Sequence, residues 1–193
     1  VITFNLKSQT VDLPGFTEPL PFNQTAFIGL QRTIIDHLGL TRIFRPAELQ
    51  GQWTSLAAAV ENNGWPLIKA LRGKFLLVLD ESEETLRPYS ALLAKPGHNI
   101  FFKSPPIGHP DAAILILNDP IKQSAEIEQA VTKGYLVRTR ADANTLEART
   151  NDATRRDAAF SSGAQLISSD YYRAEPRFKG YYEVRFESGG FVR

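Results

Sequence analysis

The 193-residue sequence predicts an α/β fold built on parallel strands, and three observations lead to this prediction. Continuous apolar runs of strand length recur along the chain, as is typical of strands buried on both faces of a parallel sheet. Segments with helical periodicity separate these runs, which favours parallel pairing through right-handed crossovers. Most runs end in polar residues, and the carboxyl ends of parallel strands meet at one edge, where α/β folds place their sites.

Five segments are predicted to be buried strands because they are rich in apolar, β-branched and aromatic residues. They span residues 1–7, 74–80, 112–117, 135–140 and 165–169. The tail alternates between apolar and polar residues at 181–186, which predicts a final edge strand. Polar side chains stand at the ends of the buried strands: Asn5 and Lys7, Asp80, Asn118 and Asp119, Arg140 and Asp142, and Asp170.

Helices are predicted at 25–38, 55–61, 124–133 and 152–162, with shorter ones opened by Arg45-Pro46 and by Trp65-Pro66. Residues 8–23 and 81–111 are rich in proline and are predicted to be loops. The second loop holds two of the three histidines, His98 and His109. The third, His37, lies near the end of the first helix, and structural or exposed-loop roles are favoured for all three.

Composition excludes few classes of function. A net charge of +1 provides no electrostatic argument for binding nucleic acid or an anionic membrane, except through local patches. The absence of cysteine excludes disulfides and thiolate metal sites. No apolar run approaches the length of a membrane span, and no signal peptide is visible. The sequence begins inside a strand-like run and contains no methionine, so we expect it to be the interior of a longer chain.

Charged and polar side chains are most frequent in and after the predicted strand that begins at Tyr135. Arg138, Arg140 and Asp142 occupy alternate positions, so their side chains are expected to leave the same face near the carboxyl end of the strand. Such charges do not belong on a buried face unless they are paired or face a ligand. Guanidinium groups suit phosphate oxygens, so these positions are candidates for anion binding, with an internal salt bridge as the structural alternative.

Five strand–helix units are compatible with two architectures. They can form an open doubly wound sheet, or they can be the later part of an eight-stranded barrel whose first three units are missing. The strand-like start at Val1 favours the barrel. Residues 1–193 are then expected to be one part of a single barrel domain.

Short motifs in the same order as in a known family support this interpretation. They are Gly64-Trp65-Pro66, residues 71–74 running into Val78-Leu79-Asp80, residues 116–119, residues 134–143, Asn151-Asp152, residues 155–159, residues 162–165, and Ser169-Asp170-Tyr171. Together they resemble the calcium-dependent phosphoinositide-specific phospholipase C family of bacteria and fungi, within the barrel-shaped phosphodiesterase superfamily. The resemblance covers nearly the whole chain, and no single motif carries it.

The resemblance implies a distorted TIM-type barrel that cleaves phosphatidylinositol or a related lipid to diacylglycerol and a cyclic inositol phosphate. In that family two histidines act as general base and acid, and Ca²⁺ assists attack of the substrate 2-hydroxyl on phosphorus. Those histidines and most calcium ligands would lie before Val1. Asn5-Leu6-Lys7 stands where the superfamily often has Glu-x-Lys, so Asn5 is the expected calcium ligand, with reduced affinity because an amide adds no charge.

Roles for the strand-end residues follow from the resemblance and from their positions. Arg138 and Arg140 are expected to bind phosphate or inositol hydroxyls, with Asp142 holding one of the two. Tyr171 is expected to offer its ring to the inositol face, with Asp170 beside it. The remaining candidates are expected to lie near the phosphate or to contact inositol hydroxyls: Lys7, Asp80 and Asn118.

Three functions remain open at this stage. The first is a secreted phosphodiesterase acting at a membrane surface, complete only with the missing half of the barrel. The second is a degenerate barrel that binds an inositol phosphate or a partner without cleaving it. The third is a related glycerophosphodiester phosphodiesterase. The arginine pattern inclines us to the first, with a phosphoinositide substrate and no nucleic-acid partner.

Overall fold

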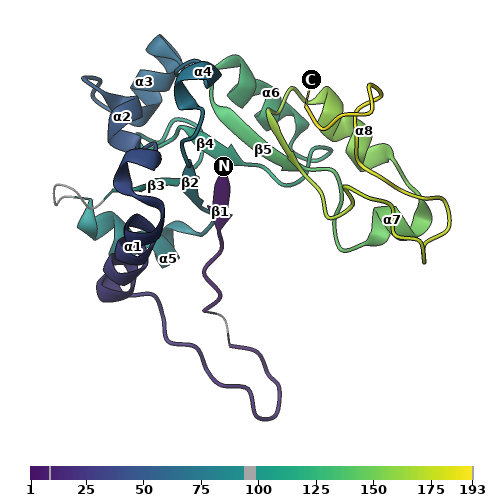
Figure 1. Cartoon of the computed structure of the whole chain (residues 1–193), viewed down its shortest axis with the longest axis horizontal. Helices are drawn as coiled ribbons and strands as arrows, with labels where there is room; N and C mark the ends of the chain where they lie inside the picture. Colours follow the sequence, from purple (N-terminus) through teal and green to yellow (C-terminus); the bar gives the residue numbers. More distant parts are fainter. Residues whose placement is uncertain (9, 94–98, 193) are drawn as a thin grey trace. The chain divides into compact units, whose positions relative to one another are not determined.

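A computed structural model describes residues 1–8, 10–93 and 99–192 of the chain. The chain divides into two compact units, Val1–Ile114 (unit 1) and Leu115–Arg193 (unit 2) (Figure 1). Both units mix helices with three-stranded sheets, so the predicted α/β class with parallel strands is confirmed. Within the described ranges, no helix combines the length and the apolar character that crossing a bilayer requires.

The sheet of unit 1 is parallel throughout. It contains β1 (Ile2–Phe4), β2 (Leu77–Leu79) and β3 (Phe101–Lys103), in that order. The central residue Val78 pairs with Thr3 on one side and with Phe102 on the other. All three carboxyl ends therefore lie at one edge of this sheet, as the sequence predicts.

Helices cover this sheet with apolar faces. They are α1 (Gln24–Leu38), the 3-10 helix η1 (Leu40–Arg42), α2 (Pro46–Gln50), α3 (Leu56–Asn63), α4 (Ile68–Leu71) and α5 (Glu83–Leu92). Asn23 caps α1 by accepting a hydrogen bond from the Ala26 amide over 2.9 Å. Phe27 of α1 and Tyr89 of α5 are fully buried and their rings lie 5.3 Å apart, which holds the two helices together in the core of unit 1.

Two elements of unit 1 differ from the prediction of a loop over 81–111. Ser82 caps α5 by accepting a hydrogen bond from the Thr85 amide, and Leu86, Tyr89 and Leu92 form its buried face. Pro88 lies inside α5, where its missing N–H removes one helical hydrogen bond. The short run Phe101–Lys103 pairs as a strand because β2 offers it a parallel edge.

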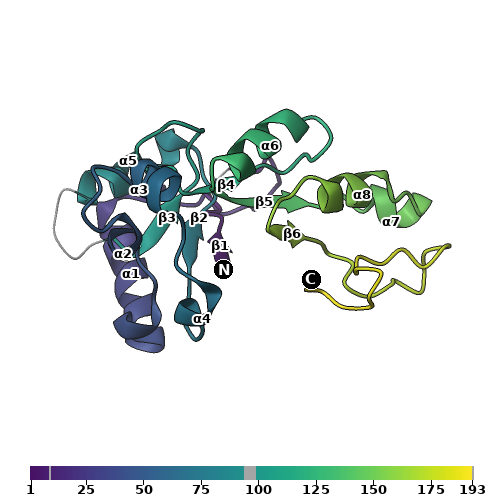
Figure 2. The ribbon, with the colours of Figure 1, turned by 90° about the horizontal axis from the view of Figure 1, so that it is seen from above.

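The sheet of unit 2 has three strands, in the order β4, β5, β6. They are β4 (Ile114–Ile116), at whose start the boundary between the units falls, β5 (Leu136–Arg140) and β6 (Leu166–Ser168). β5 and β6 are parallel, with Arg140 opposite Ser168. The helices are α6 (Ser124–Thr132), α7 (Leu146–Thr150) and α8 (Thr154–Ser161); α6 and α8 both pack against β5 (Figure 2).

The prediction of an edge strand at 181–186 is wrong. Tyr181 has a φ of +56°, in the left-handed region, which interrupts the extended backbone that a strand requires. The segment is instead fixed by isolated bonds: the Val184 amide donates to the Tyr171 carbonyl over 2.9 Å, and the Tyr182 hydroxyl donates to the Ala141 carbonyl over 3.0 Å. The apolar alternation therefore reflects burial of Tyr182 and Val184 in the core of unit 2.

Candidate functional site

Two arginines leave the same face of β5. Arg138 and Arg140 alternate with Val137 and Thr139, which are fully buried on the opposite face, whereas both arginines are half-buried. Arg138 Nη1 donates a hydrogen bond of 2.5 Å to the side-chain oxygen of Asn118, just beyond β4. The structure thus brings together two residues that the sequence predicts at neighbouring strand ends.

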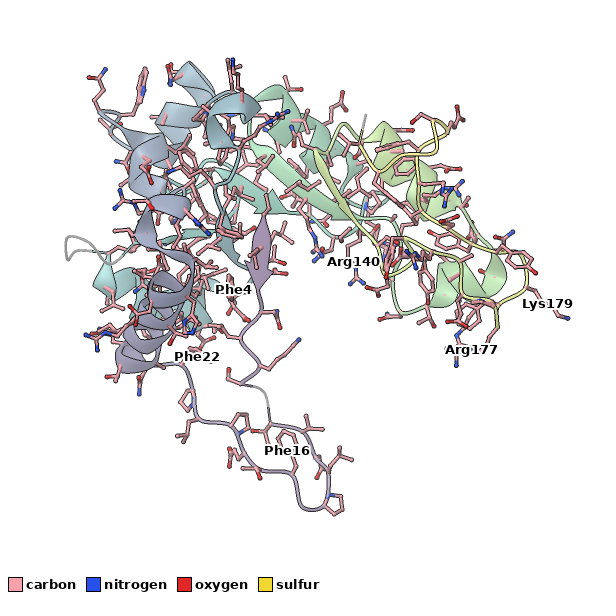
Figure 3. All side chains as sticks on the ribbon, in the orientation of Figure 1. Phe4, Phe16, Phe22, Arg140, Arg177 and Lys179 are labelled. Carbon is pink, nitrogen blue, oxygen red and sulfur yellow. The ribbon has the colours of Figure 1, made fainter. Side chains whose placement is uncertain are left out.

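Arg140 is the last residue of β5, and its side chain projects from the end of that strand (Figure 3). Within the part of the chain that the structure describes, its guanidinium has no hydrogen-bond or ion-pair partner. A cation without a protein partner must be hydrated or meet an anion. Its planar set of N–H donors fits the oxygens of a phosphate group. Arg140 is therefore the strongest candidate for contact with an anionic ligand.

Asp142 has a different role from the predicted one. Its side chain is almost fully buried, and one carboxylate oxygen accepts a hydrogen bond from the Ser169 hydroxyl. The other oxygen accepts from the Asp170 amide over 3.2 Å. The carboxylate therefore holds the turn after β6, and among the described residues it forms no ion pair with Arg138 or Arg140.

Asp170 and Tyr171 follow β6 but lie in contrasting positions. Asp170 is exposed, and its side chain is free to meet a ligand. Tyr171 is only 8% exposed, and its ring lies 5.7 Å from that of Tyr182 and 6.2 Å from that of Phe178. The predicted contact between the Tyr171 ring and an inositol face is therefore corrected: the ring packs in the core of unit 2.

Unit 1 holds the other predicted strand-end residues. Asn5 is exposed, and its Nδ2 atom donates to the Asp80 carbonyl over 3.1 Å, which links the ends of β1 and β2. Next to Asp80, Glu81 accepts a hydrogen bond from the Leu6 amide. Lys7 is exposed and has no partner within the described residues. Asn5, Lys7 and Asp80 thus stand at the carboxyl edge of the unit 1 sheet, as the sequence predicts.

A pocket of about 270 Å³ lies beside this edge. Its lining residues are Glu81, Ser82, Glu83, Leu86, Ser90, Lys103, Ser104, Pro105 and Pro106. The buried Lys103 at the end of β3 forms an ion pair with Asp111 over 2.5 Å and donates to Ser90 over 3.2 Å. Sequence reasoning missed Lys103 because residues 100–103 lack strand length and sit among prolines.

The described histidines do not stand at the ends of strands. His37 contacts the Thr33 carbonyl through Nδ1 over 2.8 Å, within its own helix. His109 Nε2 lies 3.3 Å from Glu83, and its Nδ1 accepts from the Asp111 amide over 3.1 Å. His98 lies outside the described residues. The structural roles favoured from the sequence agree with the positions of His37 and His109.

Comparison with known proteins decides the family. Residues 1–193 match the sequence model of the family "Phosphoinositide phospholipase C, Ca2+-dependent". The chain belongs to this family.

A solved structure has a similar fold. It is a Ca²⁺-dependent phosphatidylinositol-specific phospholipase C from Streptomyces antibioticus, with a TM-score of 0.57 and 18% sequence identity. The match covers 79% of this chain, and the chain spans 61% of the length of that enzyme. A search of curated proteins found no match.

The family is Ca²⁺-dependent, so a set of calcium ligands is expected near the strand ends of this phospholipase C-like chain. Calcium prefers about six to eight oxygen ligands, several of them carboxylates. Within the described ranges, no three histidine or acidic side chains come together as metal ligands would. Asn5 keeps one neutral amide oxygen, and Glu81 is already bonded to an amide. The described residues therefore do not fit a calcium site by themselves.

Arg155 of α8 supports the strand ends of unit 2, and sequence reasoning gave it no role. Its Nε atom donates to Glu147 over 2.9 Å, and its Nη1 atom donates to the Asn118 carbonyl over 3.3 Å. Glu147 in turn accepts from the Ala143 amide over 2.8 Å. Arg155 also lies 3.5 Å from Asp119, whose pKa is lowered, chiefly by the Lys122 amide that donates to it. The sequence motif at 155–159 could have indicated that Arg155 matters, but a motif does not show which residues its side chain contacts.

Proposed function

We propose that this chain supplies the phosphate- and inositol-binding edge of a phosphoinositide phospholipase C. The observation that carries the proposal is Arg140, a half-buried residue whose guanidinium has no hydrogen-bond or ion-pair partner among the described residues, beside Arg138 on one face of β5. Two cations at this position would offset charge on the phosphodiester, and the charge grows at the phosphoryl oxygens in the transition state. Lys7, Asp80, Asn118 and Asp170 would contact inositol hydroxyls or the phosphate.

We further propose that both units belong to one distorted TIM-type barrel, of which this chain supplies the later strand–helix units. Parallel strands with polar carboxyl ends in unit 1 support this, as does the family to which the chain belongs. The remaining units, with a histidine pair that acts as general base and acid, would lie outside the 193 residues. The products would be diacylglycerol and a cyclic inositol phosphate, formed when the substrate 2-hydroxyl attacks phosphorus.

Binding and turnover are tested separately. Binding of inositol monophosphate to the 193-residue chain is measured by calorimetry, and release of cyclic inositol phosphate from phosphatidylinositol vesicles is measured with Ca²⁺ and with a chelator. The proposal expects binding that is lost in Arg140→Ala. Binding unchanged by that substitution would overturn the assignment of the phosphate-binding edge.

A second candidate is a module that binds inositol phosphates without cleaving them. The positions of His37 and His109, away from the strand ends, favour it for the isolated chain. Binding without turnover in the presence of Ca²⁺ would support this candidate. A glycerophosphodiesterase is distinguished by competition, because glycerophosphoinositol and glycerophosphocholine would then displace inositol phosphate equally well.

We also propose that the enzyme acts outside the cell on lipids of a membrane surface, without a nucleic-acid partner. Membership of the family supports the lipid surface alone, because a phosphoinositide is a membrane lipid. Recovery of the native protein from culture medium rather than from cells would agree with the proposal, and retention in cells would contradict it.

A further inference from the structure

Residues 10–20 form a loop, here called the 10–20 loop, that follows the carboxyl end of β1 and extends away from the sheet of unit 1 (Figures 1 and 3). Four large apolar side chains lie exposed on it. They are Val11, Leu13, Phe16 and Leu20, with exposed fractions of 46, 61, 42 and 87%. Scattered apolar residues on a surface are ordinary, but four within ten positions of one loop point to an interaction surface.

Two backbone hydrogen bonds hold the turn at the tip of the loop. The Leu13 amide donates to the Val11 carbonyl over 2.8 Å, and the Phe16 amide donates to the Leu13 carbonyl over 3.0 Å. Pro14 has no N–H, and Gly15 adopts a φ of +79°, which closes the turn. The amides of Leu13 and Phe16 are thus bonded within the loop, which lowers the cost of moving these two residues toward an apolar medium, while the other loop amides need water and confine the loop to the hydrated interface.

The position of the loop agrees with such a role. β1 ends at Phe4, and Asn5, whose side chain bonds to the Asp80 carbonyl, marks the carboxyl edge of the sheet. The loop begins a few residues further on, so it leaves from the edge that carries the proposed substrate-binding groups of unit 1. An enzyme that takes its substrate from a bilayer must turn this edge toward the lipid.

The charge of the loop excludes electrostatic attraction to anionic lipid. Asp12 and Glu18 are its two charged residues, and both are acidic. Thr10 donates to Glu18 over 3.4 Å, across the base of the loop. Attraction to a membrane would therefore come from the apolar side chains alone, and Asp12 would limit the depth to the interfacial region.

We propose that the 10–20 loop inserts Leu13 and Phe16 into the interface of a phospholipid bilayer and so docks the protein on the membrane that holds its substrate. This proposal rests on the proposed function, because the lipid substrate is the reason to expect a bilayer at this edge. The class of partner is a zwitterionic or weakly anionic lipid surface, recognised through apolar insertion.

The absence of cysteine provides a direct test. Phe16→Cys is labelled with an environment-sensitive fluorophore and mixed with phosphatidylcholine vesicles that contain no phosphatidylinositol. The matched control is Leu67→Cys, because Leu67 is 79% exposed and precedes α4, which Figure 1 shows on the opposite side of unit 1. We expect a blue shift and increased emission at position 16 and no change at position 67. No change at position 16, or equal changes at both, would overturn the proposal.

Vesicle partitioning gives a second readout. Full burial of one large apolar side chain raises a partition coefficient by more than about tenfold. The double variant Leu13→Ser with Phe16→Ser should therefore lower the vesicle partition coefficient about tenfold or more. Leu67→Ser with Ile68→Ser, also exposed, should leave partitioning unchanged, and Asp12→Asn should raise it. Added salt should not weaken binding, since no basic residue is involved. The proposal is contradicted if the loop double variant partitions like the parent, or if the Leu67 and Ile68 double variant loses as much partitioning as the loop variant.

The same variants separate this proposal from the proposed function. Binding of soluble inositol monophosphate depends on Arg140 and should be unaffected by the loop substitutions. If Arg140→Ala has no effect while the loop variants lose vesicle binding, the phosphate-binding assignment fails and membrane docking stands. If the loop variants bind vesicles normally while Arg140→Ala loses inositol phosphate, docking by this loop fails and the proposed function stands.

Discussion

Arg138 donates a hydrogen bond of 2.5 Å to the side-chain oxygen of Asn118, and this bond joins the middle of β5 to the segment just beyond β4. A backbone bond lies beside it, from the Leu117 amide to the Arg138 carbonyl over 2.9 Å. The orientation of Arg138 is therefore fixed by the neighbouring strand. Arg140, two residues further on, has no such partner among the described residues. One arginine is positioned, and the other remains available to a ligand.

Asn118→Ala should weaken inositol phosphate binding about fivefold, because Arg138 loses the acceptor that orients it. Stability should change by no more than about 0.5 kcal/mol, since the Asn118 side chain is exposed. Calorimetry and thermal unfolding measure the two effects. A drop in stability without a change in affinity would show that the bond serves the fold alone.

Arg140→Ala should weaken inositol phosphate binding about tenfold or more, because a charge-assisted bond to the phosphate is lost. The free energy of unfolding should stay within about 0.5 kcal/mol of the parent, since no hydrogen bond or ion pair of the guanidinium to a described residue is broken. The matched control is Arg177→Ala. Arg177 is 82% exposed and bonds within its own segment to Glu175, so its removal should leave affinity unchanged. Equal losses of affinity and stability in Arg140→Ala would contradict the ligand role.

The alternation of side chains along β5 was the part of the site that the sequence could predict. A period of two places Arg138 and Arg140 on one face, and strand order then brings Asn118 close to Arg138. The partner of Asp142 could not be predicted in this way. Asp142 lies beyond the end of β5, where the backbone turns and alternation no longer applies, and its partner Ser169 comes from a different strand end.

In the fold, too, elements set by local sequence could be predicted, whereas elements set by contacts between distant residues could not. Long apolar runs and capped helices, such as α1 after Asn23, could be predicted from local sequence. By contrast β3 is three residues long, and it pairs only because β2 offers a parallel edge. The tail alternates like a strand, yet Tyr182 and Val184 are buried by packing against Tyr171 rather than by a ladder. Tertiary contacts override local propensity in such segments.

The pKa of Asp119 predicts a pH-dependent contribution to stability. The pKa is lowered, chiefly because the Lys122 amide donates to the carboxylate, with Arg155 contributing through its charge. A group whose folded-state pKa lies below its unfolded value of about 3.9 stabilises the fold above that pH, and the contribution is lost as the pH falls through the folded value. Asp119→Asn should therefore lower the Tm slightly near neutral pH.

The difference should correspond to less than about 1 kcal/mol, because the side chain is partly exposed and its ion pair is screened. Thermal unfolding of both proteins as a function of pH checks this. The two curves should begin to approach each other below about pH 4 and should converge once the pH falls below the lowered pKa of the folded carboxylate. A constant offset across the whole range would show that packing, and not charge, explains the difference.

Arg155 offers the sharpest test of how the site is supported. The guanidinium joins Glu147 of α7, the Asn118 carbonyl and Asp119, and its side chain is 19% exposed. Arg155→Ala leaves Glu147 nearly buried without its cation, so the free energy of unfolding should fall by about 1–3 kcal/mol. The Asn118 segment should also loosen, and binding of inositol phosphate should weaken although Arg155 is not assigned a contact with the ligand.

Arg155→Lys separates charge from geometry. Lysine keeps the positive charge but cannot donate to three acceptors in one plane, so stability should be partly restored while ligand affinity stays low. Unfolding by denaturant and calorimetry on the same samples measure both quantities. Full recovery of affinity in Arg155→Lys would mean that charge alone matters, and the fixed geometry of the Asn118 segment would then not be what positions Arg138.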